Sequence, residues 1–212
     1  MEYLVNSLIR CKFFFATFLL VTFLSFQSWV KADDIRDFEI EGISIGDNAL
    51  NFYSKSFIDD IKDFYPGSKE FFRATIEFNE KENQFSSVQL HMKIEEGNYI
   101  VYSISGLIYF DRNDSKSVCL NKRKKIVDDI SSILINTKKS KPEINIYNKD
   151  KTGNSSHDTI YFDFNPDQSE YAKVGCVFYG DEFYKKTKWP NHLRLAFTSS
   201  EFHYWLLDEA YN

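Results

Sequence analysis

Cysteine, histidine and glycine are scarce in this chain of 212 residues, which contains 3 Cys, 4 His and 8 Gly. The cysteines show no CxxC spacing and no Cys/His cluster, which argues against a zinc module. The glycines build neither a phosphate-binding loop nor a dinucleotide fingerprint, and no GxSxG elbow or HExxH motif occurs. The motifs therefore predict no catalytic residue, no cofactor and no metal site.

The histidines are His91, His157, His192 and His203. Each stands alone among ordinary strand, loop or helix residues, so their spacing does not predict a joint metal site. Oxygen-bearing side chains alternate from Asp163 to Ser169 as in a calcium loop, but the loop's glycine and final glutamate are missing, and we interpret the segment as a polar turn. Dispersed histidines and acidic residues can still converge in a fold, so an enzyme site stays open.

Long apolar runs are confined to the N-terminus, where Arg10 and Lys12 precede a run from Phe13 to Phe26. Val30-Lys31-Ala32 then places small residues where a signal peptidase reads them. This pattern predicts a cleaved signal peptide over residues 1–32, a mature chain that begins at Asp33, and a periplasmic or secreted protein. The alternative is an uncleaved anchor, since the apolar segment is just long enough to span a thin bilayer.

Removal of residues 1–32 leaves residues 33–212, which is a normal size for one domain with its own core. The removed segment holds three basic residues and one acidic residue, so the net charge changes from −5 to −7. This acidic balance argues against general nucleic-acid binding. We expect no membrane span in the mature chain.

The exported chain keeps two of the three cysteines, because Cys11 leaves with the signal peptide. An even pair in an oxidising compartment usually forms a disulfide, which here would join Cys119 to Cys176. Both residues fall on the apolar side of their segments, so the bond would link a helix to a strand. A catalytic or metal-binding cysteine is the alternative.

Alternating and helical patterns predict an α+β fold. Residues 88–95 alternate strictly between apolar and polar side chains, Glu96-Gly97-Asn98 is typical of a hairpin turn, and residues 100–110 are expected to form a second strand. A long amphipathic helix follows, with Cys119, Ile126, Ile130, Ile133 and Leu134 on its expected buried stripe.

Further segments complete this prediction. Strands are expected over residues 38–46, 71–78, 144–147, 159–164, 172–179 and 192–198. A small helical unit is expected within residues 48–65 and a final helix after Ser199 or Ser200, while residues 148–157 are a polar tip. The predicted fold is therefore an antiparallel sheet of about six or seven strands, packed by one long amphipathic helix, with a small N-terminal helical unit and a C-terminal helix.

Four short segments of the chain resemble segments of other proteins. They are the segment from Phe38 to Asp47, the segment Tyr102-Ser103-Ile104-Ser105-Gly106, the Cys119 helix and the final Ser-Glu-Phe helix. Across most of the mature chain these motifs resemble a group of uncharacterised exported proteins of marine alphaproteobacteria. The resemblance implies export and a shared fold, and it implies no functional residue.

One local run of cations departs from the acidic composition: Lys122, Arg123, Lys124 and Lys125. It is a candidate contact for an anionic surface or an envelope protein, although a solvated helix face, with cations favoured near a helix C-terminus, is the simpler explanation. We therefore expect a non-catalytic exported protein that binds or supports a partner in the cell envelope. The alternative is an exported enzyme, such as a hydrolase, whose acidic residues and histidines converge in the fold. A cleft with convergent titratable groups would favour that alternative.

The export prediction can be tested by the intact mass of the secreted protein. We expect a chain that begins at Asp33 and gains the mass of two hydrogen atoms on reduction. A mass that still includes Met1 to Ala32 would support the anchor instead. Two free thiols before reduction would exclude the predicted disulfide.

Overall fold

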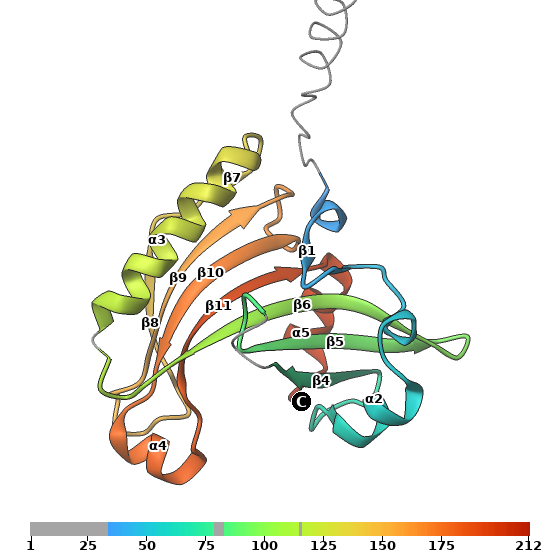
Figure 1. Ribbon diagram of the computed structural model, residues 1–212, viewed down its shortest axis with the longest axis horizontal. Helices are drawn as coiled ribbons and strands as arrows, with labels where there is room; N and C mark the ends of the chain where they lie inside the picture. Colours follow the sequence, from blue (N-terminus) through green and yellow to red (C-terminus); the bar gives the residue numbers. More distant parts are fainter. Residues whose placement is uncertain (1–33, 79–82, 115) are drawn as a thin grey trace, which may run out of the picture. The chain divides into compact units, whose positions relative to one another are not determined.

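The computed structural model describes residues 34–78, 83–114 and 116–212 (Figure 1). The expected signal peptide and the expected mature N-terminus at Asp33 lie outside the described residues. Within the described part of the chain, no helix is both long and apolar enough to cross a membrane.

The architecture is α+β, as predicted, and it is built on a nine-stranded sheet whose neighbouring strands run antiparallel. In spatial order the strands are β3 (Lys62–Phe64), β4 (Phe71–Glu77), β5 (Ser87–Glu95), β6 (Asn98–Phe110), β11 (Asn191–Thr198), β10 (Tyr171–Phe178), β9 (Ser156–Asp163) and β7 (Lys138–Lys139), with β8 (Glu143–Ile146) also paired to β9. The helices beyond the N-terminal unit are α3 (Lys116–Ile133), α4 (Asp181–Thr187) and α5 (Ser200–Asp208). The N-terminal unit consists of η1 (Ile35–Asp37), β1 (Glu39–Ile40), β2 (Ile43–Ser44), η2 (Ala49–Asn51) and α2 (Lys55–Ile61).

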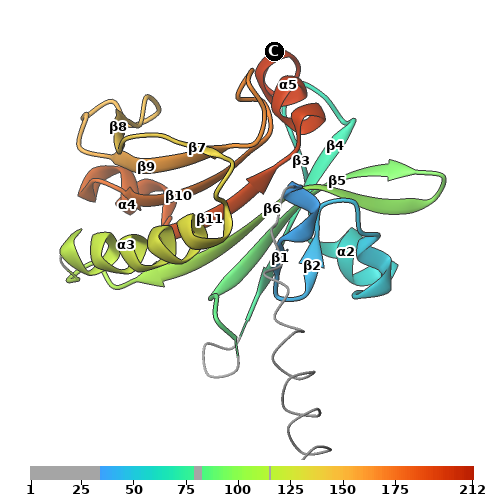
Figure 2. The same ribbon diagram turned by 90° about the horizontal axis from the view of Figure 1, so that it is seen from above.

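The two faces of the sheet differ in chemistry, because successive residues of a strand point to opposite sides. On β10, Val174 and Cys176 are fully buried in the main hydrophobic core, whereas Lys173 lines a hollow on the other face. Figure 2 shows α3 and the N-terminal unit on one side of the sheet and α5 on the other. We call these two sides the α3 face and the α5 face.

On the α3 face, side chains from α3, the sheet and the N-terminal unit form one hydrophobic core. Helix α3 contributes Cys119, Val127 and Ile130 to this core. The predicted stripe is partly wrong, because Ile133 is 43% exposed whereas Val127 is buried. The observed buried stripe runs through positions 119, 123, 127, 130 and 134, which are three or four residues apart. It includes Arg123, a charged residue that the apolar pattern could not assign to the buried side.

The two predicted disulfide partners meet on this face. The Sγ atoms of Cys119 on α3 and Cys176 on β10 lie 2.03 Å apart, at disulfide bonding distance, and the Cα atoms lie 6.1 Å apart. Both side chains are buried. The pair therefore links the long helix to the middle of the sheet.

On the α5 face, the C-terminal helix packs on one end of the sheet. Phe202 and Trp205 form a second hydrophobic cluster with Phe71 of β4. The side chain of Ser199 accepts a hydrogen bond from the backbone N–H of Phe202, so Ser199 caps α5 as expected. Because α5 covers only this end, the rest of the α5 face is free to form a site.

Several sequence expectations need correction. The sheet has nine strands rather than six or seven, because short edge strands such as β3 and β7 carry too few residues to show alternation. The expected strand over residues 38–46 is a separate hairpin of β1 and β2, since Glu41 and Gly42 take positive φ angles of 52° and 79° and turn the chain. Helix α4 was not expected at all.

The central hairpin differs in one detail. Its turn is as predicted, with Glu96 and Gly97 at φ angles of 48° and 83°. However, the β5–β6 register shifts at His91, so that Val101 joins the core while Ser103 faces the other side. Strict alternation would place Val101 and Ser103 on one face, and the β-bulge between them reverses it.

The Cys119–Cys176 pair should contribute strongly to stability. A loop of 57 residues closed in the unfolded chain corresponds to about 4 kcal/mol in the chain-entropy account. We expect reduction of the wild-type protein to lower its free energy of unfolding by about that amount. Urea titration with and without reductant measures it, and a double Cys→Ala variant, which reductant should not affect, is the control. Equal stability of the oxidised and reduced wild-type protein would contradict this role.

Candidate functional site

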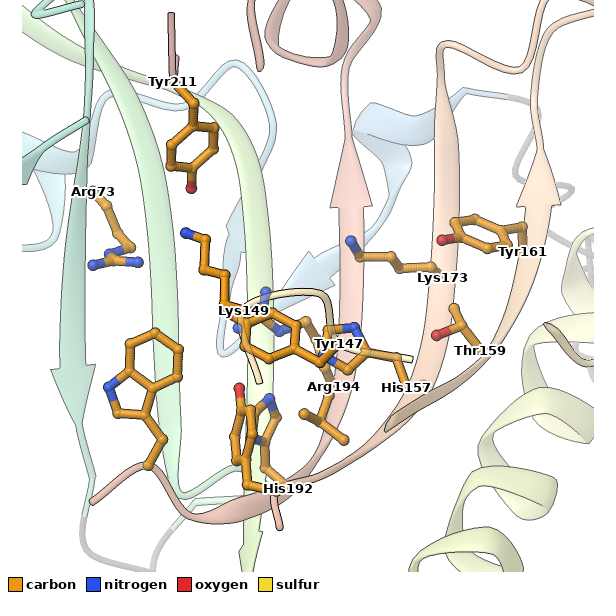
Figure 3. Close-up of a pocket in the computed structure, with 14 residues that line it drawn as sticks. Arg73, Tyr147, Lys149, His157, Thr159, Tyr161, Lys173, His192, Arg194 and Tyr211 are labelled. Atoms are coloured by element: carbon orange, nitrogen blue, oxygen red, sulfur yellow. The ribbon is translucent and has the colours of Figure 1, made fainter. Parts of the chain in front are cut away.

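A cavity of about 250 Å³ opens on the α5 face. An adjoining hollow of about 150 Å³ shares the lining residues Arg73, Lys173, Arg194 and Tyr211, and it reaches Phe202 of α5. We call the two hollows together the cationic cavity, and Figure 3 shows the larger of them. At the opposite end of the cavity, aromatic side chains near α4 pack on one another and form what we call the aromatic group: Tyr147, Tyr179, Phe183 and Trp189.

Three basic side chains reach the cavity from three strands. Arg73 comes from β4, Lys173 from β10 and Arg194 from β11. Each occupies the polar position between two core residues of its strand, so strand alternation directs it to the α5 face. Strands β4 and β10 are not neighbours, but the sheet is curved (Figure 2), and Arg73 and Lys173 line the same cavity.

Small residues on the cavity floor leave room beside the cations. Gly175 pairs with Arg194 across β10 and β11, and Ala196 pairs with Lys173. A Cβ atom on Gly175 would lie 2.7 Å from Oγ1 of Thr159, which is closer than real Cβ contacts. The register therefore sets a missing or short side chain opposite each of the two central cations.

Arg194 is only partly satisfied by protein groups. Its Nη2 donates to Oε1 of Gln89 at 3.2 Å, and Gln89 in turn donates to Oγ1 of Thr75 at 3.2 Å. The Nε atom of Arg194 is buried and has no hydrogen-bond partner. Guanidinium groups present five donors that match carboxylate and phosphate oxygens, so the unpaired donor favours an anionic ligand.

The charges in the cavity are of one sign. None of the described residues that line either hollow is Asp or Glu. Burial, and then the neighbouring Arg194, lowers the pKa of Lys173 to about 8, and burial lowers the pKa of Arg194 as well. Both shifts have the direction expected for cations that have lost water without gaining a carboxylate.

Two histidines, His157 and His192, line the larger hollow next to the aromatic group. Nδ1 of His192 lies 3.0 Å from the backbone oxygen of Pro190, and because a carbonyl only accepts, Nδ1 carries the proton and Nε2 is the acceptor. The Nε2 atoms of His192 and His157 are buried without a hydrogen-bond partner. Burial lowers the pKa of His192 to about 3 and also lowers that of His157, so both rings are neutral near pH 7.

Tyrosine side chains, with Lys149, form the remaining walls of the cavity. The ring of Tyr147 stacks on His157 with centroids 5.1 Å apart. Lys149 lies over the ring of Tyr211 at 4.8 Å, and Figure 3 shows these two side chains meeting above the sheet. Burial raises the pKa of Tyr161 and of Tyr179 to about 12, so their hydroxyls stay protonated and can donate to a ligand.

The adjoining hollow contains a tyrosine–histidine pair. The hydroxyl of Tyr65 lies 2.5 Å from Nδ1 of His91, and the ring of His91 packs against Phe202 with centroids 4.8 Å apart. Burial and the nearby arginines hold the pKa of His91 well below its usual value. This end of the cavity therefore adds a neutral, hydrogen-bonded wall to the cationic centre.

The predicted run of cations on α3 lies outside this cavity and does not form one surface. Arg123 is buried, donates to the backbone oxygen of Asp158 at 2.8 Å and also pairs with that carboxylate, so its expected place on the solvent side is wrong. Lys124 pairs with Asp128 at 2.7 Å along the helix. Lys122 and Lys125 are exposed, and their contact with an anionic partner stays a prediction.

Sequence reasoning missed the cavity because its cations sit at positions that usually face water. Lys173 and Arg194 occupy the polar positions of alternating strands, where side chains usually face solvent. His157 was predicted to lie in a polar tip, but it lies in β9. The available signal was that β10 and β11 carry basic residues with no acidic residue between their ends. No group of three or more His, Cys, Asp or Glu side chains within the described ranges is arranged to hold a metal ion.

Comparison with known proteins found no matching family model, no similar curated protein and no similar solved structure. The cavity must therefore be interpreted from its own chemistry. It presents a cationic centre, neutral imidazole acceptors, tyrosine donors and an aromatic wall.

His192 should make the protein sensitive to acid. Its folded pKa of about 3 lies below the unfolded value near 6.5, so the unfolded chain binds more protons between these values and stability falls as the pH drops through that window. Between pH 7 and pH 5 the loss from this residue is about 2 kcal/mol. Urea unfolding of wild type and of His192→Asn, which keeps a donor for the Pro190 oxygen, should show a shallower pH slope in the variant. Identical slopes would contradict the assignment.

Proposed function

We propose that this protein is an exported binding protein that takes a small organic anion, bearing a carboxylate or a phosphate, into the cationic cavity. The observation that supports this proposal is that Arg73, Lys173 and Arg194 meet in a cavity whose described lining contains no acidic side chain. The whole chain is acidic, with a net charge of −5, so this local excess runs against the composition. Perturbed titratable groups gathered in one cavity mark a candidate ligand site.

An empty cavity costs free energy, because its buried cations have no negative charge beside them. Cations that are partly removed from water are destabilised unless an anion or strong acceptors replace the water. Arg73 has a protein partner in Asp63, whereas Arg194 has a neutral one in Gln89. An anion placed between Arg194 and Lys173 would supply the missing charge and accept from the unpaired Nε donor.

The size of the site favours a small molecule over a macromolecular surface. The larger hollow, of about 250 Å³, is slightly below the usual range for drug-sized ligands, and with the adjoining hollow of about 150 Å³ the cavity falls near the lower end of that range. The aromatic group at one end offers a place for an apolar or planar part of the ligand. Export to the periplasm or the exterior, which we also propose, would expose the site to extracellular solutes.

The rival proposal is an exported enzyme. Convergent titratable groups in a cleft favour it, and His157, His192 and Lys173 provide such groups. However, hydrolases that use paired carboxylates need an acidic residue at the site, and none lines the described cavity. Binding is therefore the function that this set of side chains supports best.

In this proposal α3 has a structural role. We propose that it is the principal helix packed on the sheet and that an oxidised Cys119–Cys176 pair holds it against β10. Cys176 directly follows Gly175, which lies on the cavity floor. The covalent link would keep that strand, and the register of Lys173, in place.

The binding proposal is tested by calorimetry with benzoate and phenyl phosphate, with benzamide as the uncharged counterpart. We expect both anions to bind and benzamide not to bind. Arg194→Gln should weaken anion binding by about 2 kcal/mol, a roughly thirtyfold increase in Kd, because a charge-assisted hydrogen-bonding group is lost. Arg73→Gln, at the far side of the cavity, should weaken it as well.

The matched control is Arg36→Gln, because Arg36 lies on η1, is exposed and pairs with Asp34 at 3.0 Å. This variant should bind the anions as wild type does. Circular dichroism checks that each variant is folded. Equal affinity for benzoate and benzamide, or an unchanged Kd in Arg194→Gln, would defeat the proposal.

A further inference from the structure

Lys173 differs from a simple electrostatic anchor in its surroundings. It extends from β10 toward the middle of the cavity in Figure 3, and it is half-buried, so a small molecule in the cavity can reach its amine. Its Nζ lies 5.8 Å from the centre of the Tyr171 ring, and no acidic side chain lines the described cavity around it. An amine without a carboxylate partner and beside another cation loses its proton readily, and the unprotonated amine is a nucleophile.

For this amine to react with an electrophile, a neighbouring group must also hold the electrophile against it. Arg194 pairs with Gly175, two positions along β10 from Lys173, so the two side chains are diagonal neighbours on adjacent antiparallel strands. Diagonal neighbours on one face lie about 7–8 Å apart at the backbone, which long side chains bridge easily. Arg194 can thus bind a carboxylate while Lys173 reaches the next carbon of the same molecule.

We propose that Lys173 captures a 2-oxo carboxylate as a reversible imine, with Arg194 binding the carboxylate. This inference rests on the proposed function, because the carboxylate is the anion that the cavity binds. A 2-oxo acid is the simplest class that places an electrophilic carbonyl carbon directly beside a carboxylate. The aromatic group adjoins this position, so a 2-oxo acid with an aryl substituent fits the cavity better than a bare one.

The step balances without any further reactant. The lone pair of the neutral Lys173 amine attacks the carbonyl carbon, and the carbonyl π electrons move to oxygen to give a carbinolamine. The oxygen then leaves as water with two protons, both of which the primary amine supplies overall, and a C=N bond replaces the C=O bond. Hydrolysis reverses the step. Burial, and then Arg194, lowers the pKa of Lys173 to about 8, which leaves a substantial neutral fraction near pH 7.5.

The experiment uses phenylpyruvate and phenylacetone, which differ only in a carboxylate against a methyl group beside the carbonyl. The mature protein is incubated with each compound at pH 7.5 and reduced with cyanoborohydride, and the modified lysines are located by peptide mass spectrometry. We expect phenylpyruvate to label Lys173 about tenfold or more above any exposed lysine, because Arg194 binds its carboxylate and holds its carbonyl carbon beside the Lys173 amine. Phenylacetone should show no such preference.

Variants separate covalent capture from simple binding. Lys173→Arg keeps the positive charge and removes the nucleophile, so covalent labelling of the intact protein by phenylpyruvate should fall to the level of its exposed lysines, whatever the substitution does to benzoate binding. Lys173→Met is the second variant in case the larger side chain disturbs folding. Arg194→Gln should lower labelling of Lys173 by phenylpyruvate about tenfold. Lys124→Arg, an exposed position on α3, should leave labelling of Lys173 unchanged.

Each outcome decides the inference. Labelling concentrated on Lys173 that depends on the carboxylate and on Arg194 supports it. Labelling spread over exposed lysines, with benzoate binding intact, overturns the imine and leaves the proposed anion binding in place. Equal labelling of Lys173 by phenylacetone overturns the 2-oxo acid as the ligand class. Absence of both anion binding and selective labelling overturns the inference together with the proposed function.

Discussion

The rest of the structure depends on strand β10, which serves both faces of the sheet at once. Val174 and Cys176 enter the hydrophobic core, and Cys176 lies at bonding distance from Cys119 of α3. The residues that alternate with them, Lys173 and Gly175, line the cationic cavity. Because strand alternation couples the two sets, any shift of β10 by one residue would move Lys173 into the core and Val174 and Cys176 into the cavity. The core therefore fixes the geometry of the site.

The cationic cavity exists because packing on the α5 face is incomplete. Helix α5 and its aromatic partners cover one end, and the aromatic group near α4 closes the other. Between them the short residues Gly175 and Ala196 leave space beside Arg194 and Lys173. In a monomeric scaffold with no ligand, such cations would ordinarily be paired or solvated. Neither cation has a carboxylate neighbour in the described lining of the cavity, and this is the physical reason for interpreting the cavity as a binding site.

Sequence periodicity predicted the scaffold better than the connections. The central hairpin, the long helix, strands β4, β9, β10 and β11 and the capped C-terminal helix all appear close to the expected positions. The errors fell where periodicity carries little information: the two- and three-residue edge strands, the hairpin of β1 and β2, helix α4 and the bulge in β6. The buried Arg123 was missed because its partner, Asp158, lies 35 residues away on β9.

The sequence by itself determined the fold class, the pairing candidates among the cysteines and the absence of familiar catalytic motifs, because these follow from local patterns and counts. It could not determine the candidate site. Arg73, Lys173 and Arg194 are separated by up to 121 positions, and each one alone looks like a solvated strand residue. Only the curvature of the sheet and the register between β10 and β11 bring them together, and those depend on the packing of the whole α3 face. Burial, which lowers the pKa of Lys173 and leaves the Arg194 Nε unpaired, is likewise a property of the assembled fold and not of any segment.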